Sequence, residues 1–189
     1  VFGGDQMLFG KAVSSSGCGM IAACDVLLWL SGKACGEIPF PEYTAFAERL
    51  RDETFYKGRR NFLGIFPRRL AQIHTEKSGR KFEYFPARKL RGKDGKKLEE
   101  IISRSLNGGV PIIVRVGFSF NGLPYKIKYP ASGKVRTGKM SWHYITITGI
   151  SKNGVLTFSS WGGRGTADCR ALSKSFGFTG GIIAADYLS

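Results

Sequence analysis

The feature that most constrains the fold is an almost unbroken apolar segment, GMIAACDVLLWL, which spans residues 19–30. Asp25 is its only charged residue. A helix that is apolar on nearly every side belongs in the interior of a domain. Ser15 and Ser16 precede the segment and are residue types that cap helix starts. We therefore predict a central buried helix, with Cys18 at its beginning.

The first half of the chain carries further helical patterns. Residues 41–53 and 67–79 each begin with a proline, which is favoured at the first helical position. Residues 96–109 place four apolar side chains on one helical face and end at two glycines. The second half changes to short runs of β-branched and aromatic residues, which are typical of strands. We predict strands over residues 110–117, 141–150, 154–161 and 179–188.

Helices followed by strands, without βαβ alternation, predict an α+β domain in which an antiparallel sheet packs against the helical half. The 189 residues fit a single domain, 1–189, with a substantial core. Residues 118–141 are rich in Gly, Pro and Lys, so we expect a long loop there. A cleft between the two halves is the natural place for a functional site.

The charge balance is strongly basic, with 29 Lys and Arg against 14 Asp and Glu and a formal net charge of +15. Such a surface attracts polyanions, including acidic polymers. The excess is dense over residues 80–97, where Arg88, Lys89 and Arg91 are candidate contacts for a polyanion. An ordinary solvated face is the alternative explanation. No run approaches 18 apolar residues, so we expect no membrane span.

The numbers and positions of the cysteines and histidines limit the metal sites and disulfides that the chain can form. The four cysteines are Cys18, Cys24, Cys35 and Cys169, and they form no CxxC pair. With only two histidines in the chain, a zinc site has too few ligands at suitable spacing, and we predict no metal and no cofactor. If Cys18 is a free thiol, the other three can form at most one disulfide.

Cys18 is the candidate nucleophile, because it stands between two glycines at the start of the buried helix. A cysteine attacks as a thiolate, and a helix N-terminus favours the thiolate by only about 0.3–1 kcal/mol. A nearby imidazolium must therefore supply most of the stabilisation. His74 lies in a polar helical pattern where an ordinary solvated or half-packed histidine is expected. His143 opens a predicted strand and is the better candidate base.

Several segments occur in a characteristic order, namely Gln6, GCG around Cys18 with its apolar helix, GGVPIIVRV, WHYITITGI and FSSWGG. This order resembles the papain-like cysteine peptidases and is closest to their C39-like branch. There, a glutamine precedes a Cys-Gly helix start, and the base occurs in a segment of the type His-hydrophobic-Val. The resemblance covers residues 6–163 and implies a papain-like fold with a central nucleophile helix.

The resemblance implies a role for each matching residue. Cys18 would be the nucleophile and His143 the general base and later acid. Gln6 and the Cys18 backbone N–H would donate hydrogen bonds to the oxyanion, although a surface glutamine is the alternative. Ser159 stands where the family has an orienting Asn or Asp. Because a serine carries no charge, the implied enzyme could be slow or inactive.

The turn before Ser159 decides whether this residue can reach His143. A tight turn at Asn153 and the following glycine would place Ser159 too far along its strand. We adopt the wider loop over residues 149–154, which places Ser159 opposite His143. Trp161 would then cover the region of His143, although core packing would also explain a tryptophan.

Three functions are consistent with these observations. The first is a cysteine peptidase that cleaves peptide amide bonds through an acyl-enzyme on Cys18. The second is a weak or inactive binding protein of the same fold that engages an acidic polymer through its basic face. The third is an acyltransferase or transglutaminase-like enzyme that uses an amine acceptor. We expect a monomer that acts on a peptide or protein substrate, and the resemblance favours a secreted bacterial protein.

Overall fold

The apolar segment forms α2 (Cys18–Leu30), as predicted. The computed structural model describes residues 4–9, 17–33, 38–55, 66–90, 95–177 and 179–185. The residues of α2 from Gly19 to Leu28 are buried, Asp25 among them. Trp29 lies at the exposed end and donates a hydrogen bond from Nε1 to the carbonyl of Gly109, at 2.8 Å. The helix therefore runs through the core and is tied at its far end to the start of the strand region.

The other predicted helices are confirmed. Prolines occupy their first turns, since Pro67 is the first residue of α4 and Pro41 the second of α3. Gly79 ends α4 with a φ of 69°, the left-handed conformation that favours glycine at a helix C-cap. The remaining helical elements are short. In chain order the elements are η1 (Gln6–Leu8), α2, α3 (Phe40–Leu50), the π-helix η3 (Arg51–Phe55), α4 (Pro67–Ser78), α5 (Ala87–Leu90), α6 (Lys96–Asn107) and α7 (Cys169–Ser175).

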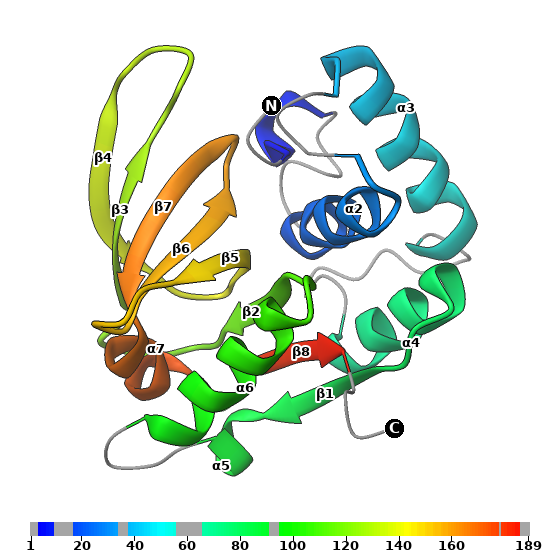
Figure 1. The fold of residues 1–189 in the computed structure, drawn as a ribbon. Helices are drawn as coiled ribbons and strands as arrows, with labels where there is room; N and C mark the ends of the chain where they lie inside the picture. The colour runs from blue at the N-terminus through cyan, green and yellow to red at the C-terminus, as the bar shows by residue number, and fades with distance from the viewer. Residues whose placement is uncertain are drawn as a thin grey trace.

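The strands of the described residues form one eight-stranded antiparallel sheet in the order β1-β8-β2-β5-β6-β7-β3-β4. Their bounds are β1 (Phe82–Pro86), β2 (Ile112–Val116), β3 (Leu123–Lys128), β4 (Val135–Met140), β5 (His143–Ile150), β6 (Val155–Ser160), β7 (Gly163–Asp168) and β8 (Gly181–Ala185). The fold class is α+β, as expected. Figure 1 shows α2, α3 and α4 on one side of the molecule and the β3–β4 and β6–β7 hairpins on the other.

The division into a helical half and a strand half is only approximate. The loop expected over 118–141 was wrong, because β3 and β4 form a hairpin within it. In β3, Leu123, Tyr125 and Ile127 are buried while the residues between them are exposed. This alternation places the proline and lysines on the solvent side, where they do not disturb the core. Three further elements were not predicted from the sequence, namely β7, α7 and β1, which pairs with β8.

The two faces of the sheet contact different sets of helices. Alternate residues of β2 show this division, since Ile113 packs with α2 and α4 while Ile112 and Val114 pack with α6 and α7. Consequently the face that carries Ile113 is where α2 meets β2 and β5 of the sheet. Within the described ranges, no helix has both the length and the apolar character needed to cross a bilayer.

Candidate functional site

A small cavity of about 10 Å³ lies where α2, the N-terminal segment and strands β5 and β6 meet. Its walls include all four residues that the sequence analysis singled out for the site. Three of them, Gln6, Cys18 and His143, are each the first residue of a helix or strand. The lining residues are Gly4, Gln6, Cys18, Ile21, Ala22, Asp25, His143, Tyr144, Thr146, Ser159, Ser160 and Trp161.

Cys18 is the first residue of α2 and a half-buried free thiol. Burial raises the pKa of this thiol above its ordinary value. Backbone groups of Tyr144 and Gly19 oppose the increase, and so does the charge of Arg115. Since the net effect is an increase, the neutral thiol is the favoured form in this cavity.

His143 is the first residue of β5 and is 7% exposed. Its Nε2 lies 2.6 Å from Oγ of Ser160, which leaves Nδ1 as the other ring nitrogen. The Trp161 ring stacks on the imidazole with centroids 4.1 Å apart and an interplanar angle of 16°, so the predicted cover of His143 by Trp161 is confirmed. Burial lowers the pKa of His143 to about 3. The cavity therefore favours a neutral imidazole and a neutral thiol, not the ion pair expected from the sequence.

The expected register between the two strands was wrong. In the structure Ser159 lies opposite Thr146, not opposite His143, and a bulge occurs between Ile147 and Gly149. The turn is tight, since the amide of Gly154 donates to the carbonyl of Ser151 at 2.9 Å. The hydroxyl that reaches His143 consequently belongs to Ser160. Ser159 also lines the cavity, but its hydroxyl donates to Asp25 Oδ2 at 3.3 Å.

Two tryptophans with left-handed backbone flank His143 in space. Trp161 has a φ of 48° and, with Gly162 at 70°, forms the two-residue turn between β6 and β7. Positive φ at both central residues is what a type I′ hairpin turn requires, and it is unfavourable for a bulky side chain. Trp142, directly before His143, has a φ of 52°. In the described part of the chain these are the only non-glycine residues with positive φ, and such outliers concentrate at functional sites.

Asp25 is the residue of this cavity whose role the sequence analysis missed. Its Oδ1 accepts hydrogen bonds from the Gly4 amide at 3.0 Å and from the Tyr43 hydroxyl at 2.9 Å, while Oδ2 accepts from Ser159. Burial raises the pKa of this carboxyl to about 7, against the effect of these three donors. The signal was present, because Asp25 is the one charge in the apolar helix and lies about two turns after Cys18.

Gln6 is held in place by the segment that Asp25 anchors. It is a half-buried residue at the start of η1 and is one of the residues that line the cavity. Gly4 donates its amide to Asp25 and accepts at its carbonyl from the Gly162 amide, at 3.1 Å. The segment thus bridges α2 and the β6–β7 turn, which places Gln6 beside both walls of the cavity.

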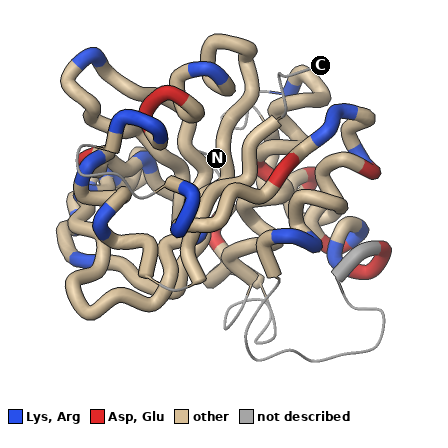
Figure 2. The backbone as a smooth tube through the Cα atoms, turned by 90° about the horizontal axis from the view of Figure 1, so that it is seen from below, with Lys and Arg blue, Asp and Glu red and all other residues tan. Residues whose placement is uncertain are grey.

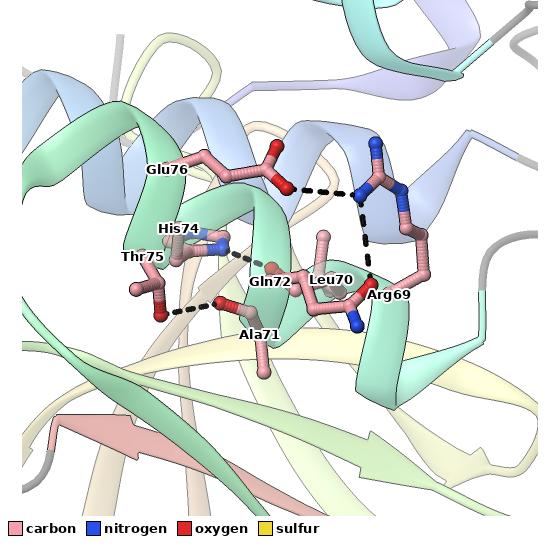
Figure 3. A network of polar contacts seen from close by, with 7 residues as sticks. All are labelled: Arg69, Leu70, Ala71, Gln72, His74, Thr75 and Glu76. Carbon is pink, nitrogen blue, oxygen red and sulfur yellow. Dashed lines mark hydrogen bonds and ion pairs between the residues drawn. The ribbon is translucent and has the colours of Figure 1, made fainter.

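His74, the other histidine, lies outside this cavity. It is fully buried in α4, its Nδ1 is 2.8 Å from the Leu70 carbonyl, and its ring packs on Phe82 with centroids 5.1 Å apart. Burial lowers its pKa to about 4. Figure 3 shows the imidazole beneath an exposed network in which Arg69 contacts Glu76. The expectation of a solvated or half-packed His74 was wrong, because one face of this polar helix points into the core.

The remaining site predictions concern metals and the basic face. Within the ranges that the structure describes, no three His, Cys, Asp or Glu side chains gather as metal ligands. Arg88 and Lys89 are exposed on α5, and Arg91 lies outside the described residues. Figure 2 shows Lys and Arg on many separate segments of the lower side of the molecule. The described part of the basic face therefore does not contribute to the cavity.

Comparisons with known proteins assign no family. No protein-family model matches the sequence, and no curated protein matches it either. The residues of the cavity and their geometry therefore carry the functional inference.

Proposed function

We propose that this chain is a cysteine peptidase with a papain-like fold, related most closely to the C39-like branch, in which Cys18 is the nucleophile and His143 the general base. One observation carries the proposal. The first residue of a buried helix and the first residue of a strand, a thiol and an imidazole separated by most of the sequence, line the same cavity. A nucleophile beside a base that a third group orients is the arrangement that activates cysteine.

The chemistry proceeds in two steps. Cys18 Sγ attacks the carbonyl carbon of a peptide bond while its proton passes to His143, and the resulting imidazolium then protonates the leaving amine. The C–N bond breaks and a thioester remains on Cys18. Water, deprotonated by His143, attacks the thioester, and the thiolate leaves and recovers the proton. Ser160 holds Nε2 of His143, so Nδ1 is the nitrogen that exchanges the proton.

Gln6 and the Cys18 backbone amide would stabilise the oxyanion that forms in both steps. A side-chain amide is a neutral donor that needs no charge of its own, and loss of one such donor costs about 2.7–4 kcal/mol. The hydrogen bonds of Gly4 to Asp25 and to Gly162 support this role, because they fix the segment that carries Gln6.

Burial favours the neutral forms of both reactive groups, which has a kinetic consequence. Proton transfer accompanies attack on the bound substrate, instead of preceding substrate binding. In the free protein, the alkylation rate of Cys18 should therefore rise with pH with an apparent pKa above the ordinary thiol value of about 8.5.

The test is hydrolysis of a mixture of synthetic peptides, followed by mass spectrometry, with the intact protein examined for a thioester on Cys18. Cys18→Ala and His143→Ala should each abolish turnover. Cys24→Ala is the matched control, because it removes the other described thiol of α2, which is fully buried and does not line the cavity. Turnover that survives in Cys18→Ala would refute the proposal. Product that forms only when a free amine is added would indicate an acyltransferase.

The second candidate is a binding protein of the same fold that engages an acidic polymer. Two observations favour it, namely the neutral state of both reactive groups and the exposure of Arg88 and Lys89 on α5. Charge reversal of these two residues should then weaken binding of a polyanion such as polyglutamate. Hydrolysis of a neutral small peptide should be unaffected by the same change.

A further inference from the structure

Arg115 is a buried cation for which the described residues supply no carboxylate. It lies in the middle of β2 and is 6% exposed. Its guanidinium lies over the ring of Trp142, 5.4 Å from the centroid, and over Tyr144 at 5.7 Å. The ion pairs of the described residues all join other side chains. Arginine is rarely so buried unless it is paired with an acid.

The aromatic neighbours account for only part of this burial. Stacking on two rings stabilises a guanidinium, and the side chain of Arg115 also interacts with the Tyr144 hydroxyl. Removal of a full charge from water costs more than such contacts return unless an opposite charge is present. A guanidinium carries five N–H donors in a planar fork that fits a carboxylate with two parallel hydrogen bonds.

Arg115 is also next to the candidate site. It pairs with Tyr144 across β2 and β5, and the following pair joins Val116 to His143. Tyr144 lines the cavity, and opposed residues of paired strands share a face, so Arg115 lies on the α2 side of the sheet. Its charge lowers the pKa of the Cys18 thiol against the effect of burial. Arg115 therefore lies one residue pair from His143 along the paired strands, and its charge favours the thiolate form of Cys18.

Part of the aromatic cluster around Arg115 reaches the surface of the protein. Trp142 covers Arg115 and is 45% exposed. The exposed ring of Phe118 lies 6.1 Å from that of Trp142, and Phe120 extends the aromatic surface further. Exposed aromatic rings therefore lie beside the buried guanidinium.

We propose that Arg115 is an anion-binding residue of this site, and that the substrate presents a carboxylate to it beside the bond that Cys18 attacks. This inference rests on the proposed function for the reaction, but the anion site itself can be tested without catalysis. The carboxylate is either the C-terminus of a peptide or the side chain of an acidic residue, since both offer the same two oxygens.

The first experiment compares the alkylation of Cys18 by iodoacetate and by iodoacetamide, which differ mainly in charge. Any change in the thiol pKa alters both rates by the same factor, so the ratio of the two rates reports anion binding alone. Arg115→Gln should lower the iodoacetate-to-iodoacetamide ratio about tenfold or more, as expected when a charged hydrogen bond is lost. Because His143 is neutral at pH 7, it should contribute little to the ratio.

Arg136→Gln is the matched control. Arg136 lies over the ring of Trp161, 5.6 Å from the centroid, but is exposed to solvent. Water and salt screen an exposed charge, so this change should leave the ratio within about twofold of the parent. Arg115→Lys, which keeps the charge without the fork, should give an intermediate ratio. In the parent protein, N-acetylglutamate should slow the labelling by iodoacetamide, and N-acetylglutaminamide, which carries no carboxylate, should not.

Equal loss of both rates in Arg115→Gln, or protection of the parent protein by both amino-acid derivatives, would overturn the anion site. The parent measurement needs no variant, so it decides the question even if Arg115→Gln fails to fold. An Arg115-dependent ratio in a protein that hydrolyses no peptide would uphold the anion site and refute the peptidase proposal.

The second experiment identifies the source of the carboxylate. Peptides are compared in pairs that differ only in a C-terminal acid or amide, or only in one Glu or Gln. For the pair that the parent protein distinguishes, Arg115→Gln should raise KM of the acidic member about tenfold or more and leave the neutral member unchanged. A fall in kcat for both members, with KM constant, would show that Arg115 only supports the fold.

Discussion

Each of two walls of the cavity holds one buried titratable group, and burial shifts the pKa values of the two groups in opposite directions. On the α2 wall, Asp25 receives three hydrogen bonds and has its pKa raised to about 7. On the strand wall, His143 has one hydroxyl partner and a stacked tryptophan, and its pKa is lowered to about 3. Burial drives both groups towards the neutral form. Hydrogen-bond donors limit the rise in the pKa of Asp25, whereas among the described residues only the Ser160 hydroxyl is hydrogen-bonded to the His143 ring.

Removal of the Asp25 carboxyl should give the largest effect. Asp25→Ala leaves the Gly4 amide, the Tyr43 hydroxyl and the Ser159 hydroxyl without their acceptor, at about 1–3 kcal/mol for each buried donor. We expect a loss of about 3–6 kcal/mol in the free energy of unfolding, measured by urea denaturation. Asp25→Asn keeps an acceptor oxygen and should lose much less. Equal stability of the two variants would show that the donors find other partners.

The pH dependence of the stability of Asp25→Asn, compared with that of the parent, isolates the effect of the Asp25 carboxyl from the effects of the two buried histidines. Asp25 has a raised pKa, so its contribution to stability is full below about pH 4 and is lost as the pH rises through about 7. Relative to the parent, Asp25→Asn should therefore gain about 1.4 kcal/mol per pH unit from pH 4 to 7, and nothing further above. Both histidines remain in the variant and cancel in the comparison. A stability difference that is constant with pH would contradict a raised pKa.

Substitution of Trp161 tests whether this ring helps to lower the pKa of His143 on the strand wall. Trp161→Asn removes the ring that covers His143 and supplies asparagine, the residue type that an Asn-Gly type I′ turn prefers. With less desolvation, the His143 pKa should rise by about one unit or more, worth about 1.4 kcal/mol. The pH titration of both imidazoles by NMR measures this shift. His74 lies outside the cavity and is the internal control, whose pKa should stay constant.

The local pattern of the chain predicted the long elements and four of the residues that line the cavity, but not the pairing of the strands. Apolar runs and proline starts identified α2, α3, α4 and α6, because these signals act within one element. The contact between His143 and Ser160 depends on a bulge and a tight turn, which shift the register of two whole strands. The role of Asp25 was missed because a lone charge in an apolar helix has meaning only when its partners are known.

The smallest predicted effect concerns two neighbouring serines, since Ser160 contacts His143 and Ser159 contacts Asp25. Ser160→Ala leaves Nε2 of His143 without its partner and should cost about 1 kcal/mol, in stability and, if the peptidase proposal holds, in the activation free energy. Ser159→Ala removes one of three donors to Asp25, so it should raise the Asp25 pKa further and leave the His143 pKa unchanged.

Peptide turnover and the pH dependence of unfolding, measured for both variants, check this last comparison. If Ser159→Ala reduced turnover more than Ser160→Ala, the orienting role would belong to the Asp25 side of the cavity. The two walls would then act as one hydrogen-bonded unit, with Asp25 acting through Ser159 on the histidine. If the losses follow the order predicted here, the carboxyl holds the N-terminal segment and the nucleophile helix together, while the strand wall alone orients the base.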